Sequence, residues 1–446
     1  MTDHPTKIAF IGAGSTVFMR NIVTDILLQE EFSNVCIALQ DIDRKRLDTS
    51  ELVAERVAQT LGAKPAIAAT LDRRAALAGA DFVIVMIQVG GYRPGTVIDF
   101  EIPTRYGLRQ TIADTLGIGG IMRGLRTVPA LLDIARDMQA LCPDALMLQY
   151  VNPMAINCLA LAKLVPRLQF AGLCHSVQGT AADLARDLNE DIDNIEYDCA
   201  GINHMDFYTR FEKRLPDGSR EDLYPRLKAI GEAGSFGPNW DGCTNEVRYE
   251  MLKRLGYFVT ESSEHFAEYT PWFIKSHQPD LIGRFNIPID EYLRRCEKQL
   301  AEWDETEQAL LADDTPVCEQ SLEYAARIIR AQVLDEPYLI HGNVLNRGLI
   351  PDLPADCCVE VPCVVDAGGL KPRAVDRLPR HLTAMMQTNI NVQQLTVEAL
   401  TTGKREAIYH AAMLDPHTGA ELNLDQIWSM VDELLDAHAG WVPEFH

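Results

Sequence analysis

The stretch Lys7-Ile8-Ala9-Phe10-Ile11-Gly12-Ala13-Gly14-Ser15 decides the fold of this chain. A short apolar run passes directly into two closely spaced glycines, and a helical pattern then covers residues 16–28. The order of strand, glycine turn and helix is typical of the first βαβ unit of a parallel sheet, because glycine lets the backbone turn tightly at the end of the strand. The stretch therefore predicts an α/β fold.

Further apolar runs repeat this pattern through the first half of the chain. They lie at residues 35–40, 82–87, 145–150 and 168–173, and segments with helical periodicity separate them, as at 43–61 and 121–141. Such alternation predicts a Rossmann-like, doubly wound and mostly parallel sheet. The alternation fades after residue 205, where residues 207–211 have the pattern of an antiparallel strand.

The second half of the chain has a different pattern. It predicts helices at 288–312, 316–334, 378–402 and 422–438, and a strand pair at 338–345 and 357–365. We therefore expect a second, α+β lobe. The predicted division is a dinucleotide-binding domain at 1–200 and a domain for substrate, metal and oligomerisation at 201–446.

Composition narrows the class of protein. Of the 446 residues, 47% are hydrophobic and 24% are charged, the ordinary balance of a soluble globular protein. No apolar run reaches the ~18 residues of a membrane span, and residues 1–11 lack the pattern of a secretory signal. The 11 scattered cysteines indicate reduced thiols, so we expect a cytoplasmic protein. The net charge of −23 disfavours nucleic acid as a partner.

The glycine turn is also a candidate phosphate site. Gly12 and Gly14 let the backbone approach a pyrophosphate, and the helix that begins after Ser15 offers its N-terminus to the negative charge. The third glycine of the usual G-x-G-x-x-G pattern is replaced by Val17, so the fingerprint is incomplete.

An acidic residue follows the second predicted strand. Asp41 comes directly after 35–40 and is placed to accept hydrogen bonds from the ribose hydroxyls of an adenosine. An acid at this position favours NAD over NADP, because it repels a 2′-phosphate. Asp43 is an alternative ribose acid, and either acid could instead cap the following helix.

Other polar groups follow the later strands. The loop at 88–93 contains Arg93, Asp114 opens a second glycine-rich loop, and Asn152, Cys174 and His204 each come at or just after a strand end. If these ends converge on one edge of the sheet, the last three residues share a cleft. A thiolate and an imidazole are a plausible half-site for a divalent ion. Taken singly, Cys174 and His204 could equally be a buried thiol and a structural histidine.

These residues resemble the motifs of glycoside hydrolase family 4, and within it the subgroup of bacterial enzymes that act on α-galactosides. The resemblance covers essentially the whole chain and is carried by the segments 10–15, 114–117, 119–123, 151–154, 174–177, 201–204, 257–269 and 386–391. The run Cys174-His175-Ser176-Val177 is the pattern associated with galactoside cleavage. One departure is Ile118, where the subgroup is expected to have proline.

The resemblance implies a set of site residues. Cys174 and His204 are expected to bind Mn²⁺ or a similar ion, and Asn152 to contact the sugar. The remaining expected substrate contacts are Arg93, Asp114 and His265. Gly12, Gly14, Ser15 and Asp41 are expected to hold NAD.

The resemblance also implies a mechanism, in which NAD takes a hydride from the sugar C3, a base removes the C2 proton, the leaving group departs, water adds and the hydride returns. This family is an exception to the two-carboxylate scheme of most glycosidases. Tyr269 is the expected C2 base, with a packed aromatic role as the alternative. His175 is expected to assist the leaving group or, alternatively, to bind substrate hydroxyls.

Several alternatives remain open at this point. A family 4 enzyme could prefer an α-glucoside or a uronic acid. The first-strand pattern also fits an NAD-dependent 2-hydroxy-acid dehydrogenase, which needs neither Cys174 nor a metal, and a non-catalytic dinucleotide sensor would be indifferent to both Cys174 and His204. The resemblance implies a homodimer or homotetramer with a small glycoside as substrate.

Overall fold

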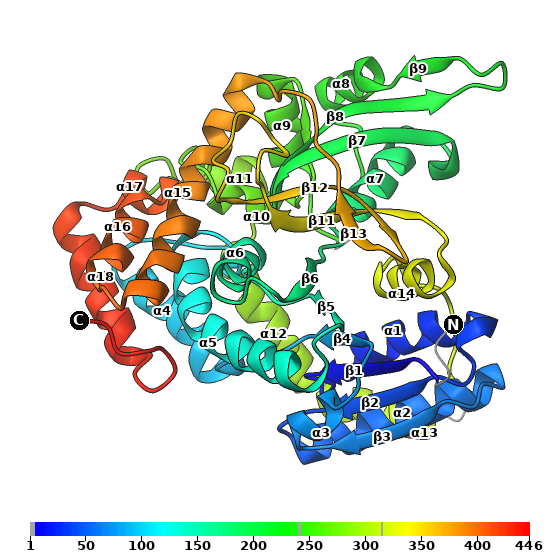
Figure 1. Ribbon diagram of the computed structural model, residues 1–446. Helices are drawn as coiled ribbons and strands as arrows, with labels where there is room; N and C mark the ends of the chain where they lie inside the picture. The colour runs from blue at the N-terminus through cyan, green and yellow to red at the C-terminus, as the bar shows by residue number, and fades with distance from the viewer. Residues whose placement is uncertain (1–4, 240–241, 314) are drawn as a thin grey trace.

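A computed structural model describes residues 5–239, 242–313 and 315–446, and these residues form one large sheet with helices on both faces (Figure 1). The sheet has 13 strands, and its main path runs β10-β8-β7-β12-β11-β6-β5-β4-β1-β2-β3. The parallel strands lie in the lower part of Figure 1, and β7 and β8 lie at its top. The two parts of the sheet are built differently.

The parallel part contains six strands in the order β6-β5-β4-β1-β2-β3. This is the strand order of a Rossmann fold. The strands are β1 (Lys7–Ile11), β2 (Cys36–Gln40), β3 (Ala66–Thr70), β4 (Phe82–Val85), β5 (Leu146–Gln149) and β6 (Gln169–Gly172). The sequence did not predict β3, because this edge strand is only partly buried and its alanine-rich run gives little hydrophobic contrast.

Helices cover both faces of this parallel part. Ile8 and Phe10 of β1 pack in the same core cluster as α1 and α2, whereas Ala9 and Ile11 pack in the cluster that contains α3 and α5. This alternation follows from the two-residue period of a strand. The helices of this half are α1 (Thr16–Leu27), α2 (Arg44–Leu61), α3 (Arg73–Leu77), α4 (Val97–Arg105), α5 (Gly117–Leu141), α6 (Met154–Leu164) and α7 (Ser176–Asp187). The predicted doubly wound fold is confirmed.

The strands of the second half extend the same sheet as an antiparallel part. They are β7 (Ile195–Ile202), β8 (Met205–Arg214), β9 (Arg220–Asp222), β10 (Phe258–Val259), β11 (Tyr338–Leu345), β12 (Cys358–Asp366) and β13 (Gly369–Pro372). The junction with the parallel part is a single pair between β6 and β11, Gly172 opposite Asn343. Asn343 in turn lies opposite Glu360 of β12, and Glu360 lies opposite Gly201 of β7. These four residues form one row across the sheet.

Two predicted helices of the second half differ from the structure. The segment 288–312 forms two helices, α12 (Glu291–Ala301) and α13 (Trp303–Ala312). The segment 316–334 is helical only from α14 (Ala325–Leu334) onward. Before it, the backbone N–H of Ser321 donates to Asp25 of α1 at 2.7 Å, so a long-range contact holds this segment out of the helix. The preceding helices of the second half are α8 (Tyr224–Ala233), α9 (Glu246–Leu255), α10 (Ser263–Glu268) and α11 (Asp280–Arg284).

The C-terminal helices form a separate layer on one side of the molecule (Figure 1, orange to red). They are α15 (Arg380–Thr402), α16 (Glu406–Leu414), α17 (Pro416–Glu421) and α18 (Leu424–Ala437). Buried residues of α15, α16 and α18 share one apolar cluster with α5. This layer therefore closes the parallel part from the side.

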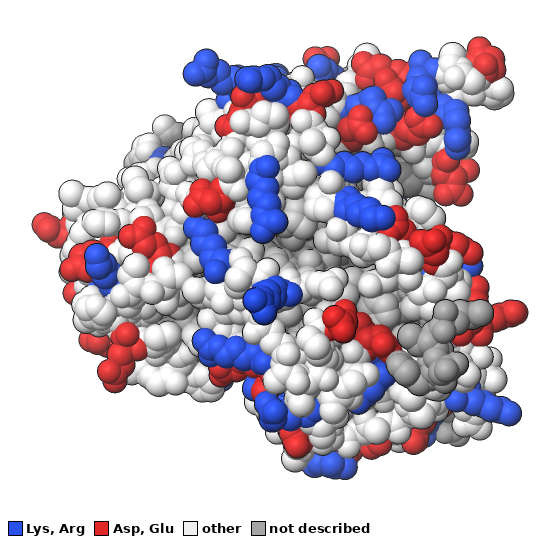
Figure 2. All heavy atoms as spheres, viewed as in Figure 1, with Lys and Arg blue, Asp and Glu red and all other residues white. Residues whose placement is uncertain are grey.

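Acidic and basic side chains are mixed on the surface over β8 and β9 (Figure 2). Arg210 donates to Asp198 at 2.7 Å, and Arg220 donates to Glu196 at 2.8 Å. Some of the acidic side chains on this surface are thus paired with arginines. Among the described residues, no helix is both long enough and apolar enough to cross a membrane.

Candidate metal centre and dinucleotide loop

The loop after β1 is built around two glycines that admit no side chain. Gly12 has φ +93°, and a Cβ atom placed on it would lie 2.8 Å from the backbone oxygen of Met86. A Cβ atom on Gly14 would lie 2.7 Å from a carboxylate oxygen of Asp41. No side chain caps the N-terminus of α1. The loop and the helix start thus fit a bound pyrophosphate.

The two acids after β2 have different partners. The N–H of Gly14 donates to Asp41 Oδ2 at 2.7 Å, so the Asp41 carboxylate lies against the glycine loop. Asp43 caps α2 by accepting the N–H of Arg46 at 3.1 Å. Of the two predicted candidates, Asp41 therefore has the position of a ribose acid, and Ser15 is exposed at the same loop.

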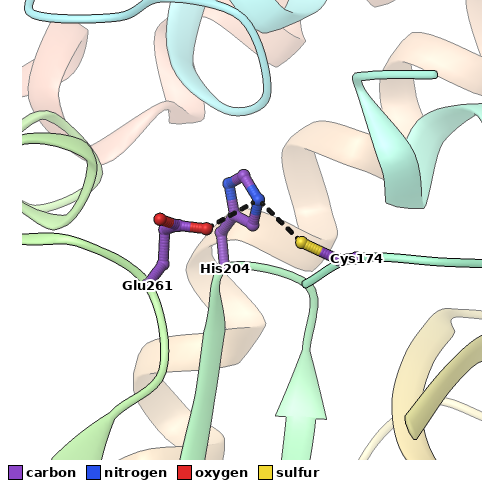
Figure 3. A group of neighbouring side chains, drawn as sticks. All are labelled: Cys174, His204 and Glu261. Atoms are coloured by element: carbon purple, nitrogen blue, oxygen red, sulfur yellow. Dashed lines mark hydrogen bonds and ion pairs between the residues drawn. The ribbon is translucent and has the colours of Figure 1, made fainter. Parts of the chain in front are cut away.

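Three side chains from distant segments meet in one buried cluster (Figure 3). Cys174 Sγ lies 3.4 Å from His204 Nε2, and the same nitrogen lies 2.9 Å from Glu261 Oε2. The three candidate ligand atoms all lie within 4.8 Å of one another. Cys174 follows β6, His204 lies in the turn between β7 and β8, and Glu261 follows β10.

Cys174 and His204 reach the cluster from two strands of the same sheet. Gly172 of β6 and Gly201 of β7 lie in one row of paired residues, with β11 and β12 between them, and Cys174 and His204 follow these glycines by two and three residues. His204 has φ +65°, a left-handed conformation that is uncommon for a residue with a Cβ atom. The tight turn between β7 and β8 imposes that conformation and aims the ring at Cys174.

The charges of the cluster favour a cation. Burial lowers the pKa of His204, but the charges of Glu261 and Cys174 outweigh it and raise this pKa to about 10. Burial opposes ionisation of Glu261, yet His204 and His265 hold its pKa well below the usual value. Burial raises the pKa of Cys174 more than His204 lowers it. A thiol, an imidazole and a carboxylate at this spacing fit a divalent transition-metal ion.

Four more predicted residues surround this cluster. Tyr269 is fully buried, and its hydroxyl lies 3.1 Å from His204 Nδ1, the ring nitrogen that faces away from Cys174. Asn152 donates from Nδ2 to Asp114 at 3.2 Å. Asp114 lies 3.7 Å from His265 Nε2. Burial disfavours the charge of Asp114, but His265 and Arg123 keep its pKa below the ordinary value.

Two predicted residues lie outside the buried cluster. Arg93 is exposed, and its guanidinium lies over the ring of Tyr92 at 5.4 Å. The side chain of His175 is 41% exposed, and its Nδ1 lies 3.5 Å from Glu323. Both side chains are therefore accessible from solvent.

Sequence reasoning assigned no role to Glu261, although it lies in the segment 257–269. The available signal was an acid two residues after the short apolar pair Phe258-Val259. Such a pair is too short to predict a strand, so the position of Glu261 at a strand end could not be recognised. Glu268, which is 3% exposed, was also missed, because it lies in α10 and its partners are backbone amides of the distant residues 111–113.

Fold and site together define the class of protein: a Rossmann-type α/β chain that joins a glycine-rich dinucleotide loop to a buried candidate metal centre. The chain belongs to family 4 of the glycosyl hydrolases. The family model matches residues 7–190, and the model of the family's C-terminal domain matches residues 199–418. The resemblance inferred from the sequence motifs is thus confirmed.

Characterised relatives span the full chain. The sequence is 49% identical to the α-galactosidase of Bacillus subtilis, over 98% of this chain and 99% of that protein. It is 34% identical to the α-galactosidase of Rhizobium meliloti, over 98% of this chain and 89% of that protein.

Solved structures show the same fold. A putative glucosidase from Bacillus subtilis has a TM-score of 0.84 at 24% identity, covering 97% of this chain and 100% of that chain. A 6-phospho-α-glucosidase from gut microorganisms, solved with NAD and Mn²⁺, has a TM-score of 0.79 at 20% identity and covers 99% and 100%. The malate dehydrogenase of Cryptosporidium parvum has a TM-score of 0.54 at 13% identity and covers 90% and 100%.

Proposed function

We propose that this chain hydrolyses α-galactosides with the help of bound NAD and of Mn²⁺ or a similar divalent cation. The observation that carries the proposal is the Cys174–His204–Glu261 cluster, whose candidate ligand atoms lie within 4.8 Å of one another. Cleavage of an α-galactoside is the activity named for relatives at 49% and 34% identity. A structure of similar fold contains both NAD and Mn²⁺.

Residues of this chain fit both NAD and the divalent cation. Gly12, Gly14, Ser15 and Asp41 would hold NAD, because the glycine turn leads into the N-terminus of α1, which no side chain caps, and Asp41 lies beside the turn. The metal cluster would hold the cation. When bound, NAD supplies reversible hydride transfer at the sugar and the cation polarises the sugar oxygens.

The residues around the cluster have proposed roles in binding and proton transfer. Asn152 donates its amide hydrogens to Asp114, which leaves its carbonyl oxygen free to accept a sugar hydroxyl. Tyr269 is the proposed base for the C2 proton. Burial raises its pKa well above the ordinary value, so it needs a cation beside His204 to lose its own proton near neutral pH.

The remaining three residues have proposed roles toward the leaving group or the substrate. His175 lies against Glu323 at 3.5 Å and would assist departure of the leaving group. Arg93 and His265 would contact the substrate. Both contacts follow the family motifs, with Arg93 in the segment after β4 and His265 in α10, which follows β10.

The deciding experiment is a panel of nitrophenyl α-glycosides, tested with NAD, MnCl₂ and a thiol reductant. We expect release of nitrophenol from the α-galactoside without net accumulation of NADH. Preference for an α-glucoside or a uronic acid would reassign the sugar within the family. Net NADH formation from a 2-hydroxy acid would instead support the dehydrogenase alternative and contradict the proposal.

We also propose a division into a NAD-binding domain at 1–200 and a domain for substrate, metal and oligomerisation at 201–446, with assembly as a homodimer or homotetramer in the cytoplasm. No cysteine of the described residues forms a disulfide, which suits a reducing compartment. Light scattering coupled to size exclusion measures the assembly, and a mass of one chain would contradict it.

A further inference from the structure

The loop that carries Asp114 is held by a buried carboxylate from α10. Glu268 is 3% exposed, and its two oxygens accept three consecutive backbone N–H groups. Thr111 donates to Oε2 at 2.8 Å, Ile112 donates to the same oxygen at 3.2 Å, and Ala113 donates to Oε1 at 2.9 Å. Three amides that converge on one buried carboxylate fix the course of the backbone immediately before Asp114.

The backbone held in this way is strained. Ala113 has φ +54°, a left-handed conformation that is unfavourable for a residue with a Cβ atom. Such a conformation persists only where the surroundings determine it. Ala113 directly precedes Asp114, so the turn at Ala113 sets the direction in which the Asp114 side chain leaves the loop.

Other elements hold the beginning of the same loop. The hydroxyl of Thr111 donates to the backbone oxygen of Glu264 at 2.7 Å, and the N–H of Tyr292 donates to the backbone oxygen of Thr111 at 3.0 Å. His417 Nε2 lies 2.8 Å from the backbone oxygen of Arg109. Only Glu268 reaches the three amides of residues 111–113 among the hydrogen bonds of the described residues.

Asp114 in turn contacts other residues of the site. It accepts the Asn152 amide at 3.2 Å and the hydroxyl of Thr115 at 2.7 Å, and it lies 3.7 Å from His265. A shift of Asp114 would release the Asn152 carboxamide, which could then rotate and no longer present its oxygen to a sugar hydroxyl.

We propose that Glu268 is a positioning residue: through the amides of residues 111–113 it fixes Asp114, and through Asp114 it orients Asn152 toward the substrate. The link to substrate rests on the proposed function, whereas the control of the loop does not. Glu268 contacts the backbone of residues 111–113 and, among the hydrogen bonds and ion pairs of the described residues, no member of the Cys174–His204–Glu261 cluster.

Hydrogen exchange tests the loop independently of any activity. In Glu268→Gln an NH₂ group replaces one acceptor and faces amide donors, so we expect the amides of residues 111–113 to exchange at least about tenfold faster. Exchange in β1 and β4 should stay unchanged. Unchanged exchange in the loop, or acceleration spread over the whole chain, would overturn the proposal.

Kinetics tests the path through Asp114. With a nitrophenyl α-galactoside, Glu268→Gln should lower kcat/KM about tenfold, mainly through KM, because binding of a sugar hydroxyl is lost. The double variant with Asp114→Asn should be no worse than Asp114→Asn alone, since both changes act on one contact. Losses that multiply would show that Glu268 acts by another route and would refute the proposal.

Two further variants keep the test decisive. Glu421→Gln is the control, because the side chain of Glu421 is 3% exposed, pairs with Lys275 at 2.7 Å and also accepts a backbone N–H, from Ser276 at 2.8 Å. It should leave KM and loop exchange unchanged. If Glu268→Gln does not fold, Glu268→Asp retains the charge but is one methylene short, and loop exchange should still rise several-fold. A wild-type protein inactive on galactosides would refute the proposed function and leave the exchange result valid.

Discussion

The dinucleotide loop and the metal cluster make their sites in opposite ways. The loop is a backbone shape, in which Gly14 has no room for a side chain because Asp41 would lie 2.7 Å away. The cluster is a set of side-chain charges, in which Cys174, His204 and Glu261 come from three distant segments. A site formed by backbone shape should therefore be sensitive to an added side-chain atom. A site formed by charged side chains should instead be sensitive to a change in the atoms that bind the cation.

The largest effect is expected at the metal cluster. Cys174→Ser replaces a soft thiolate by a neutral hydroxyl, so cation affinity should collapse and turnover should fall on the order of 10³-fold. Isothermal titration with Mn²⁺ and nitrophenol release measure the two losses. NAD affinity should stay within about threefold, since the loop is a separate structure. If the variant still bound Mn²⁺ with wild-type affinity, the metal cluster would not depend on its ligand atoms as expected.

The next effect is expected at the loop. Gly14→Ala places a Cβ atom 2.7 Å from the Asp41 carboxylate, so the loop or the acid must move. We expect NAD affinity to fall about 100-fold, with Mn²⁺ affinity unchanged. Fluorescence titration with NAD checks this, and equal losses of both ligands would show that the two sites are not independent.

A smaller effect should follow when only the charge near the loop is changed. Asp41→Asn keeps the shape and an acceptor for the Gly14 N–H but loses the negative charge. NAD binding should weaken about tenfold, and the preference for NAD over NADP should shrink in the same experiment. An unchanged preference would assign the ribose contact to another residue.

The smallest effect concerns pH and the antiparallel part of the sheet. Burial lowers the pKa of His341 to about 4, although Asp198 opposes the shift, so this ring is neutral in the folded protein. Below pH 6.5 the unfolded chain binds a proton that the folded chain excludes. Stability should therefore be fully present above pH 6.5 and fall by up to about 1 kcal/mol per pH unit as the pH drops toward 4.

Denaturant unfolding at several pH values measures this slope. His341→Phe keeps a ring against Tyr197, with which His341 stacks at 5.9 Å, and removes the titrating group. The variant should lose less stability on acidification than the wild type. Identical slopes would mean that the acid sensitivity lies elsewhere.

The loop could be predicted from sequence because its determinants are local. Residues 12–15 are contiguous, and their glycines determine the turn without reference to the rest of the chain. The doubly wound, mostly parallel fold likewise follows from the alternation of apolar runs and helices. The non-helical segment before α14 could not be predicted, because its conformation depends on a contact between Ser321 and Asp25.

The cluster could be predicted only in part. Sequence reasoning brought Cys174 and His204 together by assuming that strand ends share one edge, yet β7 runs antiparallel to its neighbours. β11 and β12 lie between the strands that precede the two residues, and hydrophobic periodicity does not encode register between distant strands. Glu261 was missed because β10 has only two residues.

The single residue pair that joins β6 to β11 has a mechanical consequence. Gly172 opposite Asn343 is one of two single-pair joints among the described strands, the other being Gly201 opposite Glu360, and Cys174 follows Gly172 by two residues. Shear between the two parts would change the spacing of Cys174 and His204 before it disturbed any longer strand pairing. A cation bound by both residues would oppose that shear. Binding of the ion and stiffening of the junction between β6 and β11 are therefore thermodynamically linked.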